Sequence, residues 1–565
     1  MSLAWTRRPV RRPPRRARNR GLRARAKVYL KDPLVSRTRA VLHKYVYVDR
    51  DTCIDVGPTS ARFTVIDYDS QNDRLEPPAS PVRRRLNGET MLEFRARPGT
   101  PQEAQINAWA TAVDTLDLFQ QPLALGREVP WAFEGSRLRI LPHAGYEANA
   151  FYSRQTRALH FGYFTAPSNR ARRIDTALSH DVVAHETAHA VLDGLRPFYL
   201  EATEADTPAF HEFVGDLAAM LSVFRDRAVI AEIARDGNRG KSLRDLAAAL
   251  APQVGAALYG AADRSFLRSA DNRLTYRDLG ADTEIHTRSQ VMTGFAFDAL
   301  EAMFRARLNA LRRTARPRDY FVELLSTATR AMVRMFLRPL DFLPPGSVQF
   351  PEYAAIVLHL DDQAYPADHL GYRRAVERAM KARGIYPDRD TNRPQPIESS
   401  RVVDRDIGLI RSSRVGAYRF LDANRDTFGI PLDVDFRVIG MATNRRLGDR
   451  GLVPHAETII QYTWDTWVGL RDVGAPGDGR LVLHPCGTLV VDDQVNVLYW
   501  ISQTYDEPRL ERVRAHVRAL FRDGRVGLNL GSNVRSARPV VLRRDESGNV
   551  TLGLNTARMH EGRPQ

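Results

Sequence analysis

The sequence has little cysteine and no long apolar run. Its 565 residues include two cysteines, Cys53 and Cys486, too few for the disulfide framework of a small secreted protein. No stretch approaches the roughly 18 apolar residues that a transmembrane helix requires. No apolar segment of about 7–15 residues follows the basic N-terminus, as a secretory signal would demand. These absences predict a cytoplasmic protein without a membrane-spanning segment.

Acidic residues are missing from positions 1–31. That segment holds ten Arg and two Lys out of a net charge of +16, which leaves +4 for all later residues. Self-repelling charge, several prolines and few apolar residues predict a disordered tail over 1–39. A basic tail binds polyanions without sequence preference, so residues 1–31 could contact nucleic acid or anionic lipid. Only Trp5 and Tyr29 flank the arginines, which argues against recognition by base stacking.

The rest of the chain divides by pattern into three parts. Residues 40–175 hold short β-branched and aromatic runs separated by Pro- and Gly-bearing breaks, which is typical of strands. Residues 176–386 hold long amphipathic stretches typical of helices. The polar, proline-bearing stretch 387–399 is predicted to be a linker, and 400–565 returns to mixed patterns. We therefore expect an α+β protein with a β-rich lobe, a helical lobe and a C-terminal α+β domain of unknown role.

The helical part contains the pattern H-E-x-x-H, which runs from His185 to His189. Because four residues make about one helical turn, both imidazoles project from one face and can meet one zinc ion. Glu186 lies beside that face and can take a proton from water without binding the metal. A solvated helix face with two histidines is the competing interpretation, and the apolar context argues against it.

A catalytic zinc ion needs a third protein ligand. Glu212 follows His189 by 23 residues, which leaves room for a turn and an antiparallel helix. Asp216 lies one helical turn further on, where it can accept a hydrogen bond from a ligand histidine, for which we favour His185. Four neighbours remain rival third ligands: Glu201, Glu204, Asp206 and His211.

These residues give the chain a resemblance to the thermolysin-like zinc metallopeptidases, a gluzincin family, over about residues 140–310. The resemblance implies a zincin-like two-lobe fold and endopeptidase activity on peptides or proteins. It implies one catalytic zinc ion bound by His185, His189 and Glu212, with Glu186 as general base. Calcium binding and oligomeric state are left open.

Weaker correspondences concern the substrate. Asn149 and Ala150, in the run N-A-F-Y, resemble the family's edge-strand signature that binds the peptide; a structural hairpin is the alternative. Arg268 is a candidate for binding the substrate carbonyl, although a surface arginine is the simpler interpretation. Asp193 also matches a motif position, and there the resemblance implies a structural role.

Two further residues resemble groups that act on the tetrahedral intermediate. His286 corresponds to a histidine that stabilises the oxyanion, and the family pairs that histidine with an upstream acid. Here Asp282 and Glu284 are both available, each at an unexpected offset. Tyr199, ten residues after His189, lies near the place of an active-site tyrosine. A satisfied structural histidine and a packed aromatic side chain are the alternatives.

Two other functions stay open at this point. A zincin-like protein that binds metal and peptide but has lost turnover would carry the same ligands. A polyanion-binding protein would need only its basic tail. Hydrolysis of a peptide substrate separates both of these from an active peptidase.

Overall fold

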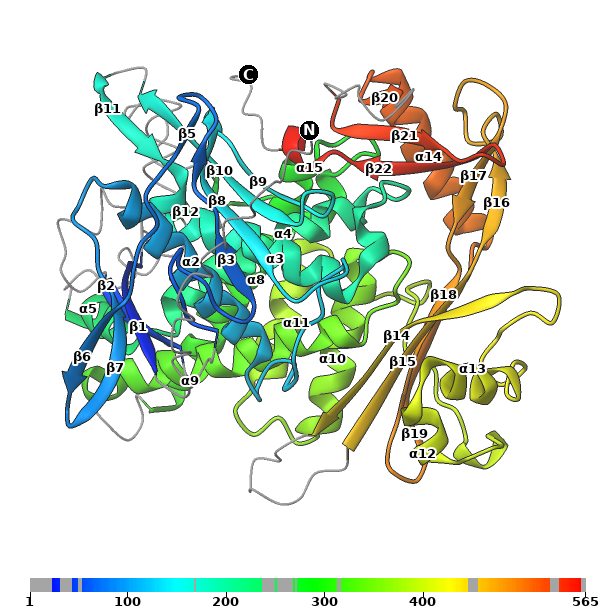
Figure 1. The fold of residues 1–565 in the computed structure, drawn as a ribbon. Helices are drawn as coiled ribbons and strands as arrows, with labels where there is room; N and C mark the ends of the chain where they lie inside the picture. The colour runs from blue at the N-terminus through cyan, green and yellow to red at the C-terminus, as the bar shows by residue number, and fades with distance from the viewer. Residues whose placement is uncertain are drawn as a thin grey trace, which may run out of the picture.

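The computed structural model describes residues 23–30, 43–48, 53–166, 169–235, 249–250, 268–269, 272–311, 317–445, 456–528 and 538–559. Within them, helices and several β-sheets alternate along the chain (Figure 1). The expected α+β class is confirmed at that level. No helix in these ranges is long and apolar enough to cross a membrane.

Two sheets form the N-terminal part. The first has the order β2 (His43–Val48), β1 (Ala24–Tyr29), β7 (Glu89–Phe94), β6 (Val82–Leu86). The second has the order β11 (Asn169–Asp175), β10 (Ala158–Ala166), β8 (Leu138–Tyr146), β3 (Phe63–Val65), and β9 (Ala150–Ser153) also pairs with β10. Helix α2 (Pro101–Gln120) packs on strands of both sheets. It begins with Pro101, at a position where a missing N–H costs no helical hydrogen bond.

The expected disordered tail over 1–39 is wrong for residues 23–30. Alternate side chains of β1 are buried and the intervening Arg25 is partly exposed, which is the alternation of a strand with one buried face. Arg25 is 2.6 Å from the carboxylate of Glu93 on the neighbouring β7. The charge run therefore contains a strand whose partner lies far along the chain. The alternating buried residues are Ala24, Ala26 and Val28. Residues 1–22 and 31–39 of the predicted tail lie outside the described part.

The central part is helical, as the pattern over 176–386 predicts. Helix α3 (His180–Leu195) packs against α2, β9 and α4 (Asp206–Phe224), and α4 also packs against α8 (Ile285–Leu311). All 19 residues of α4 are buried, so this helix lies inside the core with no solvent face. The remaining helices here are α5 (Arg227–Arg235), α9 (Pro317–Leu337), α10 (Phe350–Ala364) and α11 (Tyr372–Arg383).

The C-terminal part, expected to be an α+β domain, holds two sheets with helices packed on them. One has the order β14 (Phe436–Arg445), β15 (Ala456–Trp464), β18 (Cys486–Val491), β19 (Val497–Gln503), with α12 (Ile407–Ser412) and α13 (Arg414–Asp422) packed on it. The other has the order β16 (Thr466–Gly469), β17 (Arg480–Leu483), β22 (Asn549–Leu554), β21 (Val540–Arg544), β20 (Val526–Leu528), with α14 (Glu507–Arg522). Figure 1 shows the two sheets on the same side of the central helices.

The C-terminal part shares the core of the rest of the protein. Ile459 of β15 and Val490 of β18 belong to the same buried cluster as the central helices. The stretch 387–399 contacts β19, where the backbone N–H of Gln395 donates to the carbonyl of Trp500 at 2.8 Å. The predicted linker is thus part of the packed structure. These contacts join residues distant in sequence, which local composition cannot reveal.

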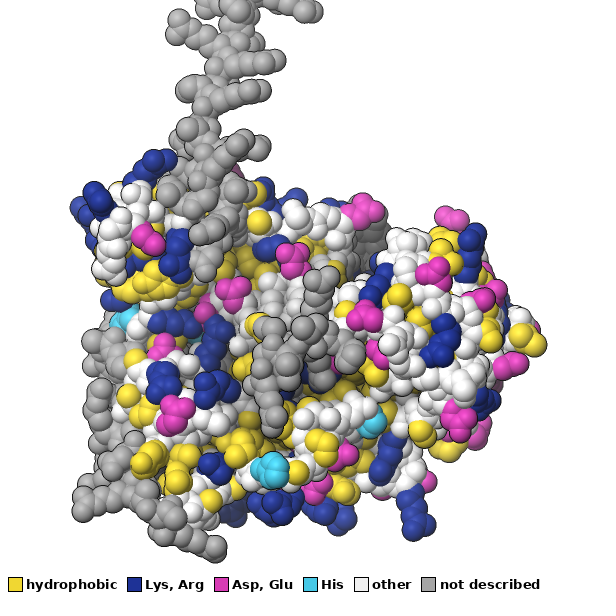
Figure 2. Space-filling model, turned by 90° about the horizontal axis from the view of Figure 1, so that it is seen from below, with side chains coloured by type: hydrophobic (Ala, Val, Ile, Leu, Met, Phe, Trp, Pro, Cys, Tyr) yellow, Lys and Arg dark blue, Asp and Glu magenta, His cyan; other side chains and the backbone are white. Residues whose placement is uncertain are grey.

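Surface charge on the described part is mixed in sign. Figure 2 shows Lys and Arg side chains lying among Asp and Glu side chains on the face seen from below. Ion pairs such as Arg437–Asp465 and Arg411–Asp493, both at 2.7 Å, join the two signs. This agrees with the small net charge that remains outside the first 31 residues.

Candidate metal centre and active site

Helix α3 places two histidines over one another. Ser179 caps the helix by accepting the N–H of Val182 with its side chain, which satisfies one otherwise unpaired donor. His185 and His189 follow one turn apart, with ring centroids separated by 4.5 Å and planes nearly perpendicular. Each is 4 % exposed. The i, i+4 spacing thus brings both rings to one buried face.

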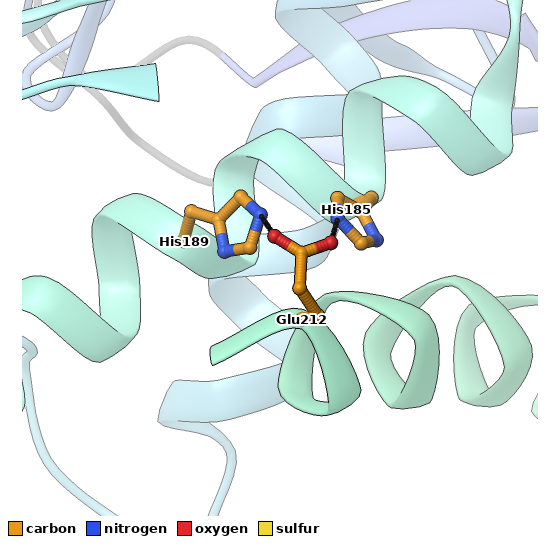
Figure 3. A group of neighbouring side chains, drawn as sticks. All are labelled: His185, His189 and Glu212. Atoms are coloured by element: carbon orange, nitrogen blue, oxygen red, sulfur yellow. Dashed lines mark ion pairs between the residues drawn. The ribbon is translucent and has the colours of Figure 1, made fainter. Parts of the chain in front are cut away.

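Glu212 on α4 faces both histidines (Figure 3). Its Oε2 is 3.4 Å from Nε2 of His185, and its Oε1 is 3.4 Å from Nε2 of His189. One ligand atom from each of the three lies within 4.8 Å of the others. With zinc–ligand bonds of about 2.0–2.2 Å, two ligand atoms of a tetrahedral site lie roughly 3.3–3.6 Å apart. Two imidazoles and one carboxylate at these separations could therefore hold a metal ion.

Asp216 and Gly215 determine the position of the His185 ring. Oδ1 of Asp216 is 3.1 Å from Nδ1 of His185, and Oδ2 accepts a hydrogen bond from the hydroxyl of Thr293 at 2.9 Å. A Cβ at Gly215 would lie 2.5 Å from Nδ1 of the same ring, closer than real side chains approach. Only glycine lets the ring pack on α4 with its Nε2 towards Glu212.

His211 supports the second ligand histidine. Its Nδ1 is 2.8 Å from Nδ1 of His189, so one ring donates and the other accepts. Burial, together with the neighbouring His189, lowers the pKa of His211 well below its usual value, which keeps His211 neutral. A neutral His211 can accept the Nδ1–H of His189 and so direct Nε2 of His189 to Glu212.

The rival third ligands have other partners. Glu201 faces His484 at 3.2 Å, Glu204 faces Arg509 at 2.7 Å, and Asp206 faces Arg288 at 2.6 Å, while His211 faces His189. Among the described residues, the metal-ligand geometry is found at His185, His189 and Glu212 alone.

Glu186 turns towards β9. Its Oε2 accepts a hydrogen bond from the backbone N–H of Tyr152 at 3.0 Å. Asp193, two turns later on α3, accepts from the Tyr152 hydroxyl at 2.8 Å and from Nε of Arg154 at 2.9 Å. Asp193 therefore fastens the edge strand to the helix, which agrees with the structural role that the resemblance implies.

The backbone of Ala150 faces the same side as Glu186. Asn149 accepts the N–H of Gly162 on β10 at 2.8 Å, so Ala150 occupies a non-hydrogen-bonded position of this antiparallel pair. Its N–H and C=O consequently point away from β10. The N–H of Tyr152, two residues on, points in that direction too and meets Glu186. Ala150 thus lies on an edge strand beside the H-E-x-x-H helix, and Asn149 immediately precedes that strand.

His286 lies at the start of α8 with its Nε2 3.4 Å from Oε2 of Glu212. Its Nδ1 is 2.6 Å from Oε1 of Glu284. Burial alone would raise the pKa of Glu284, but hydrogen bonds from His286 and nearby backbone N–H groups lower it to about 2. Glu284 is therefore the acid partner, whereas Asp282 pairs with Arg522 at 3.2 Å.

Tyr199 does not fit its predicted role. Its hydroxyl donates to the carbonyl of Pro344 at 2.8 Å, and the side chain is fully buried against Phe210. The short 3-10 turn η3 (Pro197–Leu200) that follows α3 directs the ring into the core. Arg268 lies on the short strand β13 (Arg268–Ser269); its side chain is outside the described part, so its role stays a prediction.

The sequence analysis did not identify several residues that support the candidate site. Tyr152 acts through its backbone N–H, which any residue other than proline supplies. Arg154 could have been sought as the partner of Asp193, because a buried carboxylate needs a counter-charge. Gly215, inside a helix and between two acids, was a detectable signal of close packing. His211 was considered only as a ligand.

Comparison of the chain with protein-family models finds no matching family. Neither a curated protein nor a solved structure matches it. The resemblance to thermolysin-like metallopeptidases therefore rests on the motif residues of the sequence.

Proposed function

We propose that the protein is a zinc-dependent endopeptidase with a zincin-like arrangement of two lobes. The convergence of His185, His189 and Glu212, with Glu186 next in sequence to a ligand, carries the proposal. Helix α3 would lie between the two lobes, because it contacts the β-rich part at β9 and the helical part at α4. Clefts between such parts are common ligand sites.

Glu186 is the general base. His185, His189 and Glu212 would hold a zinc ion, which would supply a Lewis acid for the scissile carbonyl and would lower the pKa of a bound water to about 7. Glu186 takes the proton of that water and passes it to the leaving amine. The N–H of Tyr152 holds the carboxylate through both transfers, since turning it away would break a buried hydrogen bond.

His286 is the donor to the oxyanion. With a pKa of about 2, Glu284 stays ionised at neutral pH and keeps a proton on Nδ1 of His286. A carboxylate partner also favours the doubly protonated ring. Nε2–H can then donate to the oxygen that becomes negative as water adds to the carbonyl.

The substrate is a peptide in extended form. The N–H and C=O of Ala150 point away from β10 and can pair with the backbone of an added strand. The clamp between Asp193 and Arg154 keeps this edge beside α3. Backbone pairing places the peptide irrespective of its side chains, so a range of sequences can be accepted.

Zinc content and peptide hydrolysis of Glu186→Ala test the proposal. The variant should keep about one zinc ion and the fold, and kcat/KM should fall by about 10²–10⁴-fold or more. Glu546→Ala, on the exposed turn between β21 and β22, is the matched control and should change nothing. His286→Ala should cost about 10²–10³-fold, the effect of one lost oxyanion donor.

Two results would refute this assignment. Equal, measurable rates in wild type and Glu186→Ala would place hydrolysis elsewhere or in a contaminant. Zinc-loaded wild type that hydrolyses no peptide would establish a metal-binding protein without turnover.

A further inference from the structure

Helix α15 (Thr556–Met559) lies on the proposed peptide-binding edge. It packs against β9 (Figure 1). Nδ2 of Asn149 donates a hydrogen bond to the carbonyl oxygen of Ala557 at 2.9 Å. Asn149 is three residues before Tyr152, which is roughly 10 Å along an extended strand. A segment from the far end of the described chain thus contacts the strand that holds the general base.

The segment is also held at a second place, the connection between α3 and α4. The N–H of Ala202, in the connection between α3 and α4, donates to the carbonyl of Leu552 on β22 at 2.7 Å. Met559 is 9 % exposed and belongs to the same buried cluster as Leu552. Residues 552–559 therefore run from the α3–α4 connection to β9.

Asn149 has the chemistry to bind a peptide backbone. Its side chain is 5 % exposed, and none of the described residues donates a hydrogen bond to its Oδ1. The Nδ2 group of this buried amide is thus paired with the Ala557 carbonyl, whereas its Oδ1 atom accepts no hydrogen bond from a described residue. A buried acceptor in this state lowers the stability of the fold. An extended peptide offers both a C=O and an N–H, and so can satisfy both atoms.

We propose that residues 555–559 occupy part of the peptide site within the same molecule and must leave before a substrate can pair along β9. This inference rests on the proposed peptidase function. His185, Glu186 and His189 are each at most 4 % exposed, so a substrate cannot reach them in the present arrangement. Release of α15 opens a route along the strand.

Occupation of the peptide site by α15 should raise KM without changing kcat. A substrate binds only the molecules from which α15 has left, so its apparent affinity falls in proportion to their fraction. Saturating substrate overcomes the competition. Removing α15 should therefore lower KM and leave kcat unchanged, whereas damage to the catalytic groups would lower kcat.

Deletion of 556–565 tests the inference. This variant keeps Asn555, whose N–H donates to the carbonyl of Pro539 at 2.8 Å, so the hairpin of β21 and β22 stays closed. KM for a peptide should fall about 10-fold or more. A chain that ends at Met559 retains α15 and should behave as the full chain. Met559→Glu, which places a charge in the cluster that anchors α15, should act in the same direction as the deletion.

A binding measurement separates this inference from the peptidase assignment. A fluorescent peptide of residues 549–559 is titrated onto zinc-loaded Glu186→Ala, with and without 556–565. Binding at least about 10-fold tighter to the shortened chain supports the occupant, even if neither parent protein hydrolyses peptides. Equal KM values and equal peptide binding in both forms, or binding to neither, would overturn the inference while leaving any observed hydrolysis to be explained by the proposed site.

Discussion

The buried acids at the start of α4 and the buried Glu212 later on the same helix have different partners. Glu204 and Asp206, at the start of the helix, each face a guanidinium group within 2.7 Å. Glu212, later on the same helix, faces the Nε2 atoms of three imidazoles, those of His185, His189 and His286, each at 3.4 Å. All three carboxylates are buried. A buried acid neutralised by arginine holds the fold together, whereas one that meets imidazole nitrogens offers a donor set to a metal ion.

Replacing Glu212 should have the largest effect, because it removes one of the three proposed zinc ligands. Glu212→Gln keeps the shape of the side chain but removes the charged ligand oxygens. Zinc content, measured by elemental analysis after mild dialysis, should drop from about one ion per chain to nearly none. Hydrolysis should be lost with it. Full zinc retention would show that another residue is the third ligand.

The corresponding change among the acids at the start of α4 should affect stability instead. Glu204→Gln leaves Arg509 buried with Glu352 at 3.0 Å as its remaining acid. The free energy of unfolding should fall by about 3–5 kcal/mol, towards the lower figure because Glu352 stays. Urea denaturation gives the change, and the folded variant should still bind zinc. A loss of zinc from folded protein would remove the distinction between these acids and Glu212.

His484 sharpens the comparison, because it lies between two carboxylates without being a metal ligand. Burial would lower its pKa, but hydrogen bonds with Asp465 and Glu201 raise the pKa to about 9. Its contribution, roughly 3 kcal/mol from the shift, is complete below the unfolded pKa of about 6.5 and is lost as pH rises through about 9. The unfolding free energy of wild type should fall over that interval, and that of His484→Gln should fall less. Parallel pH profiles would contradict the assignment.

Replacing the groups that support the proposed metal ligands should have the smallest effects. Asp216→Asn and His211→Leu should each weaken zinc binding by about 10–100-fold, since each removes the acceptor that orients a ligand histidine. His211→Asn retains an acceptor and serves as the matched control, with a smaller loss. Competition with a chelator measures the affinities. An unchanged affinity in His211→Leu would make its contact with His189 incidental.

The candidate site was predictable where it depends on short spacings. One helical turn relates His185 to His189 and Glu212 to Asp216, so the pattern alone places each pair on one face. Position along the chain did not suffice for Tyr199, because a 3-10 turn redirects it to the carbonyl of Pro344.

The fold was less predictable where pairing is distant. In β1, the charged Arg25 and Lys27 alternate with the buried Ala24, Ala26 and Val28, and the charge obscured this alternation. Their environment depends on β7, more than 60 residues later. A truncation that tests polyanion binding by the tail should therefore stop at residue 22, because removal of 1–31 also removes a strand from the middle of its sheet.

The two residues of the Asn149–Ala557 contact are synthesised at different times. These residues are 408 positions apart. At about 5–20 residues per second, ribosomal synthesis separates them by roughly 20–80 s. A nascent chain thus acquires His185, His189 and Glu212 long before it acquires the segment that covers β9. During that interval the residues of the edge strand lack the segment that contacts them in the complete fold, so another peptide can pair with them first.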